Sequence, residues 1–336
     1  MQGVDEGAVT TWLVAHVDGL VAPLQYELIA GGRSNLTYCV TDCNGRRVVL
    51  RRPPLGHVLA TAHDMAREHR IISAVGRTAV PVPAALALCQ DDSVTGAPFY
   101  VMDHVEGVVL GSDEAGYAVA PEMRRALGLH LIDVLGDLHA ADIDAIGLGD
   151  LGKRDGYVAR QVRRWSAQWE QSRTRDLPAV DEVARRLGLR IPEQQGVAIA
   201  HGDYRFGNLL VDADQGRVVA VLDWELCTLG DPLADVGYLG VYWAGPGKAA
   251  RHNDPTGAPG FPTYAELLDR YAARTGRDLS DIQYYVAFSS FRLAVISEGV
   301  YARYVHGAMG DMPDEIGQFK DAVEELSMTA LIALGG

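Results

Sequence analysis

The sequence has few cysteines and no long apolar segment, and both absences narrow the class of protein. Its 336 residues include four cysteines, none of which forms a Cys-x-x-Cys pair or a spacing typical of metal sites. No run of 18 apolar residues occurs, and the N-terminus lacks a basic segment followed by an apolar one. The sequence therefore predicts neither a membrane-spanning nor a secreted protein. We expect free thiols in a reducing cytoplasm.

Basic residues are fewer than acidic ones. Lys and Arg number 30 against 44 Asp and Glu, which gives a formal net charge of -14. Because binding to phosphate backbones needs a basic face, nucleic acid is not expected as a major partner. No internal repeat or low-complexity tract is present. The length suggests about two domains, and a hydrophobic share of 48% is enough to build a sizeable core.

One stretch in the second half of the chain alternates short apolar runs with polar clusters. Leu209–Val211 and Val218–Leu222 read as two strands, and the polar, glycine-containing segment between them predicts a hairpin turn. Asp203 and Asn208 then lie on the loop before the hairpin, and Asp223 lies at its far end. The pattern therefore brings two carboxylates and one amide to the same end of a rigid element.

These three side chains have the chemistry that phosphoryl transfer requires. One carboxylate orients the attacking hydroxyl and accepts its proton, while an amide oxygen and a second carboxylate hold Mg²⁺ against the phosphates. The order and spacing predict Asp203 as the base and Asn208 and Asp223 as metal ligands. The alternative is an acidic hairpin with an Asx turn and no catalytic role.

The run from His201-Gly-Asp to Asn208, followed by Asp223-Trp-Glu, resembles the aminoglycoside phosphotransferase superfamily, the small-molecule branch of the protein-kinase-like fold. The resemblance implies an α+β fold with two lobes. Residues 1–103 would form a nucleotide-binding lobe with an antiparallel sheet, and residues 104–336 a mainly helical catalytic and acceptor-binding lobe. It also implies an enzyme that uses ATP and Mg²⁺ to phosphorylate a small-molecule hydroxyl. GTP as donor and the oligomeric state stay open.

The resemblance implies a phosphate-binding hairpin tip near the N-terminus. The segment Gly31-Gly-Arg-Ser-Asn35 lies between two predicted strands, so its glycine amides would cover the phosphates, with Gly31, Gly32, Ser34 and Asn35 as the contacting residues. Without the catalytic stretch this motif would indicate only a turn.

The third predicted strand carries arginine where protein kinases carry the phosphate-binding lysine. Arginine keeps the charge and offers a fork of donors to phosphate. Arg51 shares a strand face with Val49, whereas Arg52 shares the other with Val48 and Leu50. The register of the family favours Arg51, although Arg52 stays open.

Two further parts of the nucleotide site follow from the resemblance. Glu68, on a predicted helix, would pair with the strand arginine. The strand before the interlobe linker would contact the base through the Asp103 carbonyl and the Val105 amide, with Met102 packing nearby.

Periodicity and turn residues predict the remaining elements. His139 and Asp235 are interpreted as structural, and Asp235 as a brace for the catalytic loop. His201 and Arg205 are expected to shape that loop without transferring a proton. The predicted helices cover residues 5–20, 60–75, 122–140, 156–169, 263–275, 279–306 and 313–334.

Arginines on two predicted helices indicate an anionic acceptor. Arg160 and Arg164 lie on one helix, and Arg292 and Arg303 share a face of another. Gly299 lies on that face too, and we expect a close approach there because glycine is costly inside a helix. These helices resemble the branch of kinase-like domains fused to acyl-CoA dehydrogenases, which implies a hydroxyacyl-CoA as acceptor.

Two alternatives remain at this stage. An aminoglycoside phosphotransferase would suit the acidic balance of the chain, because its acceptor is a polycation. A nucleotide-binding pseudokinase module would fit the missing strand lysine, but it is disfavoured by retention of Asp203, Asn208 and Asp223.

Overall fold

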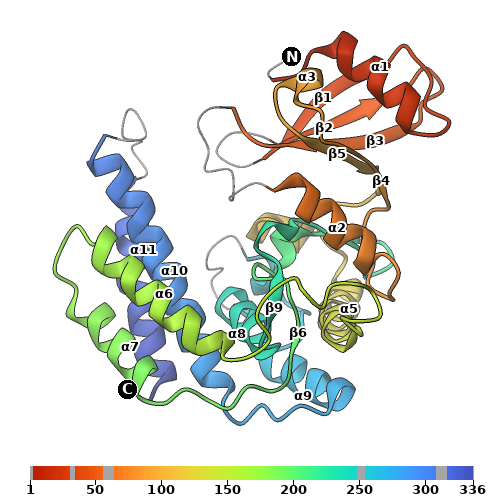
Figure 1. Ribbon diagram of the computed structural model, residues 1–336. Helices are drawn as coiled ribbons and strands as arrows, with labels where there is room; N and C mark the ends of the chain where they lie inside the picture. The colour runs from red at the N-terminus through yellow and green to blue at the C-terminus, as the bar shows by residue number, and fades with distance from the viewer. Residues whose placement is uncertain (1–2, 31–34, 56–63, 248–253, 308–315, 336) are drawn as a thin grey trace.

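The N-terminal part of the computed structural model is a five-stranded antiparallel sheet flanked by helices (Figure 1). The model describes residues 3–30, 35–55, 64–247, 254–307 and 316–335 of the chain. The sheet order is β1-β2-β3-β5-β4. In chain order the elements are α1 (Glu6–His16), β1 (Gln25–Ala30), β2 (Leu36–Thr41), β3 (Arg47–Arg52), α2 (Met65–Val75), β4 (Ala85–Cys89), α3 (Asp92–Thr95) and β5 (Phe99–Asp103).

The two faces of the sheet pack against different apolar clusters. The alternation of side chains along each strand determines which cluster a residue joins. Val48 and Leu50 of β3 belong to an apolar cluster with Val9 and Leu13 of α1. Val49, from the opposite face, belongs to the main core together with residues of α2 and the second lobe. Because successive side chains point to opposite faces, Arg51 lies on the inner face with Val49.

The second lobe is mainly helical and carries a short hairpin at its junction with the first (Figure 1). The elements of this lobe are α4 (Asp113–Ala118), α5 (Pro121–Ala140), α6 (Tyr157–Ser172), α7 (Pro178–Leu189), β6 (Ala198–Ala200), η1 (Phe206–Asn208), β7 (Leu209–Asp212), β8 (Arg217–Val221), η2 (Trp224–Leu226), β9 (Thr228–Gly230), α8 (Leu233–Tyr242), η3 (Pro255–Gly257), α9 (Tyr264–Thr275), α10 (Ile282–Val305) and α11 (Ile316–Ala333). The long helix α10 packs against α6, α8 and α11.

Backbone hydrogen bonds join the hairpin to both the linker and the first lobe. Val108 of the linker and Val211 of β7 exchange two N–H to carbonyl bonds of 2.9 Å. The Val221 amide of β8 donates to the Pro81 carbonyl at 2.8 Å. The hairpin is thereby held where the two lobes meet. None of the described helices is both long and apolar enough to cross a membrane.

The predicted α+β fold with two lobes is confirmed, whereas several element boundaries differ. The helix predicted over residues 5–20 ends at His16, because Val17 is extended and Gly19 takes a left-handed φ of 75°. The helix predicted from residue 60 begins at Met65, where Asp64 caps it by accepting the Arg67 amide. Helix α7 was not predicted.

Candidate active site

The loop between β6 and η1 needs glycine and a neutral histidine to take its shape. Gly202 has a φ of 85°, and a Cβ there would lie 3.1 Å from Leu226. The His201 ring lies 2.8 Å from the Leu222 carbonyl through Nε2, and the Asp203 amide donates to its Nδ1 at 3.2 Å. These contacts define a neutral imidazole with its proton on Nε2. His201 therefore joins the loop to the end of the hairpin.

Asp235 of α8 braces the same loop, as the sequence predicted. Its carboxylate accepts the His201 amide at 2.7 Å and the Gly202 amide at 2.9 Å, and it lies 3.2 Å from Nε2 of His139. Burial alone would raise the pKa of Asp235, but the His139 imidazole and the amides lower it. The carboxylate is thus a buried anchor with a structural role.

Asp203, Asn208 and Asp223 come together at one end of the hairpin. Asn208 Nδ2 donates to Asp203 Oδ2 at 2.7 Å and to the Asp203 carbonyl at 2.8 Å. The Leu222 amide donates to the Asn208 carbonyl at 2.9 Å, which places Asn208 beside Asp223. Asp223 has a φ of 62°, a left-handed conformation that Asp tolerates better than most residues.

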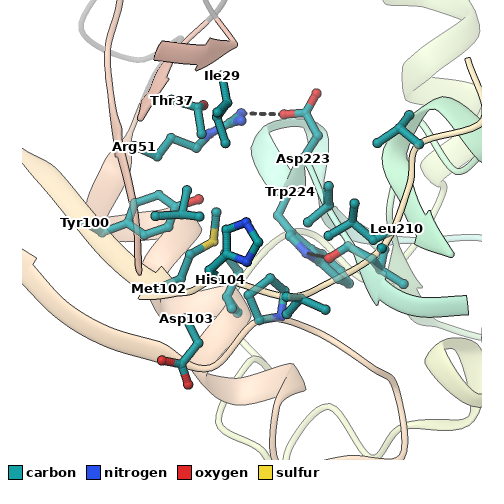
Figure 2. A pocket seen from close by; sticks show the side chains of 18 residues that line it. Ile29, Thr37, Arg51, Tyr100, Met102, Asp103, His104, Leu210, Asp223 and Trp224 are labelled. Carbon is teal, nitrogen blue, oxygen red and sulfur yellow. Dashed lines mark hydrogen bonds and ion pairs between the residues drawn. The ribbon is translucent and has the colours of Figure 1, made fainter. Parts of the chain in front are cut away.

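Arg51 reaches across from the sheet to this cluster, and Arg52 does not. Arg51 Nε lies 3.1 Å from Glu68, and Arg51 Nη2 lies 2.5 Å from Asp223. Figure 2 shows the contact between Arg51 and Asp223. Arg52 turns away and donates to the carbonyls of Pro53 and Thr95. The geometry thus favours Arg51 as the counterpart of the kinase lysine.

Glu68 is buried beneath Arg51 and is held by two other groups. Tyr100 donates to it at 3.1 Å and Asn35 Nδ2 at 3.2 Å. Burial raises the pKa of Glu68, and the Arg51 guanidinium opposes that shift. Of the predicted hairpin tip, only Asn35 is described. Gly31, Gly32 and Ser34 lie outside the described residues.

Carboxylates outnumber cations around Arg51, and this imbalance fits a divalent cation. Glu225 Oε2 is 4.0 Å from Arg51, so one guanidinium faces Glu68, Asp223 and Glu225. Burial and the nearby Asp223 raise the pKa of Glu225 to about 7. Since Asn208 Nδ2 is engaged with Asp203, its Oδ1 is the atom that remains for a metal. An amide oxygen and a carboxylate are hard ligands that suit Mg²⁺.

A metal at this site would need ligands from the nucleotide as well. Among the residues that the structure describes, no group of three or more His, Cys, Asp or Glu side chains could hold an ion. Such sparse protein ligation is usual for Mg²⁺ bound together with substrate phosphates.

A cavity of about 380 Å³ lies between the lobes, with Arg51 and Asp223 at one end (Figure 2). Its size is within the range of small-molecule sites. Met102, Asp103 and Val105, the segment predicted to contact the base, are among the residues that line it. Its apolar walls come from both lobes and include Ile29, Val49, Ile72, Leu210 and Trp224.

The four predicted acceptor arginines are not all together. Arg164 and Arg292 both lie over the same indole, with guanidinium carbons 5.3 and 5.7 Å from the Trp165 ring centre. Arg292 also donates to the Gly202 carbonyl at 2.8 Å, so it contacts the catalytic loop. Arg160 donates to the Lys153 carbonyl instead. Arg303 is exposed near the C-terminal end of α10.

The close approach expected at Gly299 is not made by the protein. Apart from Gly299 itself, its chain neighbours and the nearby backbone of its own helix, no described atom lies within 4 Å of the place where a Cβ would sit. The face of α10 between Arg292 and Arg303 is therefore open at this residue, and packing does not explain the glycine.

Tyr238 contacts Asp203, the predicted base, and sequence reasoning did not identify this tyrosine. Tyr238 lies on α8, and its hydroxyl donates to Asp203 Oδ1 at a distance of 2.5 Å. Arg205, which was expected to shape the loop, donates to the same oxygen at 3.3 Å. Tyr238 is 35 residues from Asp203 in an apolar helix, where no local pattern distinguishes it from a core tyrosine.

A sheet lobe and a helical lobe that enclose a pocket, with carboxylates facing an arginine at one end, define a kinase-like phosphotransferase. A model of the phosphotransferase enzyme family matches residues 25–281. The chain belongs to this family of phosphotransferases.

Known relatives show the same fold over nearly the whole chain. A Ralstonia eutropha structure assigned provisionally as an aminoglycoside phosphotransferase is 34% identical, with a TM-score of 0.85 and 98% of each chain covered. The GDP and kanamycin complex of APH(2″)-IIIa is 17% identical with a TM-score of 0.64, covers 95% of this chain and 98% of its own, and shows the fold alone.

One curated relative is much longer than this chain. Mouse acyl-CoA dehydrogenase family member 10 is 36% identical over 322 residues, which cover 94% of this chain. Those residues amount to 30% of the mouse protein, so the chain spans less than a third of that relative.

Arg51→Ala is expected to raise the KM for ATP about tenfold or more, because a charge-assisted contact contributes about 1.5–3 kcal/mol. Steady-state kinetics at varied ATP measure the effect. Arg52→Ala is the matched control. It removes a neighbouring guanidinium that donates to the backbone carbonyls of Pro53 and Thr95, so it should lower the melting temperature and leave the KM unchanged. Equal KM effects from both variants would contradict the assignment of Arg51.

Proposed function

We propose that the chain transfers the γ-phosphoryl group of ATP, in the presence of Mg²⁺, to a hydroxyl of a small molecule. The observation that carries this proposal is the convergence of Asp203, Asn208 and Asp223 opposite Arg51, at one end of the interlobe cavity. A pseudokinase would not need this set of groups. The free thiols of all four cysteines favour a cytoplasmic site of action.

Each residue of the cluster has a role that its contacts support. Asp203 orients the acceptor hydroxyl and takes its proton, with its carboxylate held by Asn208. Asn208 and Asp223 would hold Mg²⁺, which when bound neutralises charge on the phosphate oxygens. Arg51, positioned by Glu68, binds phosphate oxygens. The Asp103 carbonyl and Val105 amide are proposed to contact the base, with Met102 against its ring.

The backbone of the interlobe linker is proposed to determine whether ATP or GTP is the phosphoryl donor. We propose ATP, although the neighbour of known structure with the same fold was solved with GDP. Comparing ATP with GTP as donor decides between them, since the hydrogen-bonding edges of adenine and guanine present different donors and acceptors.

For the acceptor we propose a hydroxyacyl-CoA. Arg164 and Arg292 both contact the Trp165 ring, Arg292 also contacts the Gly202 carbonyl, and Arg303 lies further along α10. In a chain of net charge -14, such arginines suit a polyanionic acceptor and would repel a polycation. The relative named as an acyl-CoA dehydrogenase family member supports an acyl-CoA acceptor.

A phosphorylation screen with labelled ATP tests the function and the acceptor together. Hydroxyacyl-CoAs, aminoglycosides and sugars are compared at equal concentrations, with Asp203→Asn as the inactive control. Transfer to a hydroxyacyl-CoA but not to kanamycin supports the proposal. Efficient transfer to an aminoglycoside alone would replace the acceptor while leaving the kinase activity.

Arg164→Ala and Arg303→Ala are expected to raise the KM for a hydroxyacyl-CoA several-fold and to leave the KM for ATP unchanged. Each removes a cation that would contact the acceptor's phosphates or carbonyls. Arg190→Ala is the control, because Arg190 is an exposed arginine paired with Asp281 at the other end of α10. If all three variants behave alike, these arginines do not bind the acceptor.

A further inference from the structure

The two oxygens of the Asp203 carboxylate are not equally engaged. Oδ1 accepts from the Tyr238 hydroxyl at 2.5 Å and from Arg205 Nε at 3.3 Å. Oδ2 accepts from Asn208 Nδ2 at 2.7 Å. A carboxylate oxygen has two lone pairs, so Oδ1 has both directed at protein donors and Oδ2 has one left. The position open to an acceptor hydroxyl is therefore at Oδ2.

Tyr238 is held in place from several sides. It lies on α8, where it is 4% exposed, and its hydroxyl lies 3.3 Å from that of Tyr242. The Arg292 guanidinium covers its ring at 5.2 Å and is itself held by the Gly202 carbonyl and the Trp165 indole. An acceptor could not displace this side chain without breaking that packing.

The Tyr238 hydroxyl also keeps its proton. Burial, with a further contribution from the neighbouring Asp203 carboxylate, raises the pKa of Tyr238 well above its usual value. It is therefore a donor to Oδ1, and it differs in this from a group that takes up or releases a proton.

We propose that Tyr238 is a positioning residue for the base, which anchors Asp203 through Oδ1 so that Oδ2 receives the proton of the acceptor. This inference rests on the proposed kinase function. In the reaction the acceptor oxygen forms a bond to the γ-phosphorus, the bond from that phosphorus to the nucleoside diphosphate breaks, and the hydroxyl proton passes to Oδ2. Arg292 acts on Asp203 only indirectly, because it holds the ring of Tyr238 in place.

Tyr238→Phe removes the hydroxyl and keeps the ring that packs on Arg292. The turnover number kcat should fall about tenfold or more, because a hydrogen bond to a charged group is lost. The KM for ATP, the KM for the acceptor and the melting temperature should not change. Tyr264→Phe is the matched control. The Tyr264 hydroxyl donates to the Val236 carbonyl of α8, the helix that carries Tyr238, and not to Asp203.

A double-mutant cycle separates positioning from a general structural role. In the Asp203→Asn background, Tyr238→Phe should reduce kcat no further, because the group it positions is already disabled. A change confined to KM, a lowered melting temperature, or independent multiplication of the two effects would each overturn the inference. Turnover is measured with whichever acceptor the screen identifies. An active Asp203→Asn variant would instead refute the proposed base, whereas an inactive Asp203→Asn beside an unaffected Tyr238→Phe would refute the role of Tyr238 alone.

Discussion

Replacing Asp203 by Asn is expected to lower kcat by about 100-fold or more while the protein folds and binds ATP normally. A positioned acid–base group contributes about 10²–10⁴-fold to a proton transfer. The Asn side chain has nearly the same shape. With its amide oxygen at the Tyr238 hydroxyl, its NH2 group faces the Asn208 Nδ2 donor, so the side-chain contact with Asn208 is lost together with the charge. Asn208 keeps its bond to the backbone carbonyl of residue 203, which should hold the loop in place.

Three measurements on Asp203→Asn make this result informative. Single-turnover kinetics report the chemical step, calorimetry reports the affinity for Mg-ATP, and thermal unfolding reports the fold. Asp214→Asn is the control, because Asp214 is exposed in the hairpin turn and its replacement removes the same charge. Near-normal turnover of Asp203→Asn would exclude Asp203 from proton transfer.

Replacing Asp223 is expected to abolish the Mg²⁺-dependent part of nucleotide binding. The proposed metal bridges the phosphate oxygens to this carboxylate, so without it Mg²⁺ has only Asn208 left among the predicted protein ligands. Two variants separate charge from backbone effects. Asp223→Ala removes the side chain, but Ala is strained at a φ of 62°. Asp223→Asn removes only the charge and tolerates this conformation.

Calorimetry with ATP alone and with Mg-ATP measures the loss for each variant. Both should bind ATP with similar affinity whether or not Mg²⁺ is present, whereas the unmodified chain should bind Mg-ATP more tightly. Arg51 keeps its contact with Glu68 in both variants, so the phosphate-binding cation stays anchored. Unchanged Mg-ATP affinity in Asp223→Asn would place the metal elsewhere.

Sequence reasoning went furthest where the determining interactions are local. The interval between Asp203 and Asn208 and the hairpin before Asp223 are short-range features, so spacing alone was enough to predict that they converge. Strand alternation placed Arg51 and Arg52 on opposite faces of the sheet, and the register of the similar family favoured Arg51. The structure places Arg51 against Glu68 and Asp223.

Only the tertiary structure shows which side chains surround Asp203 and where the arginines predicted to bind the acceptor lie. Tyr238 reaches Asp203 from 35 residues away, and Arg292 reaches Gly202 from 90 residues away. Both contacts depend on how α8 and α10 pack, and periodicity reveals which face of a helix is apolar but not which residue of another element it meets. The sequence by itself therefore indicated the chemistry of the catalytic stretch through local spacing, and the two-lobed fold through its resemblance to a known phosphotransferase superfamily. Helix packing determined which oxygen of Asp203 stays open and where the arginines lie.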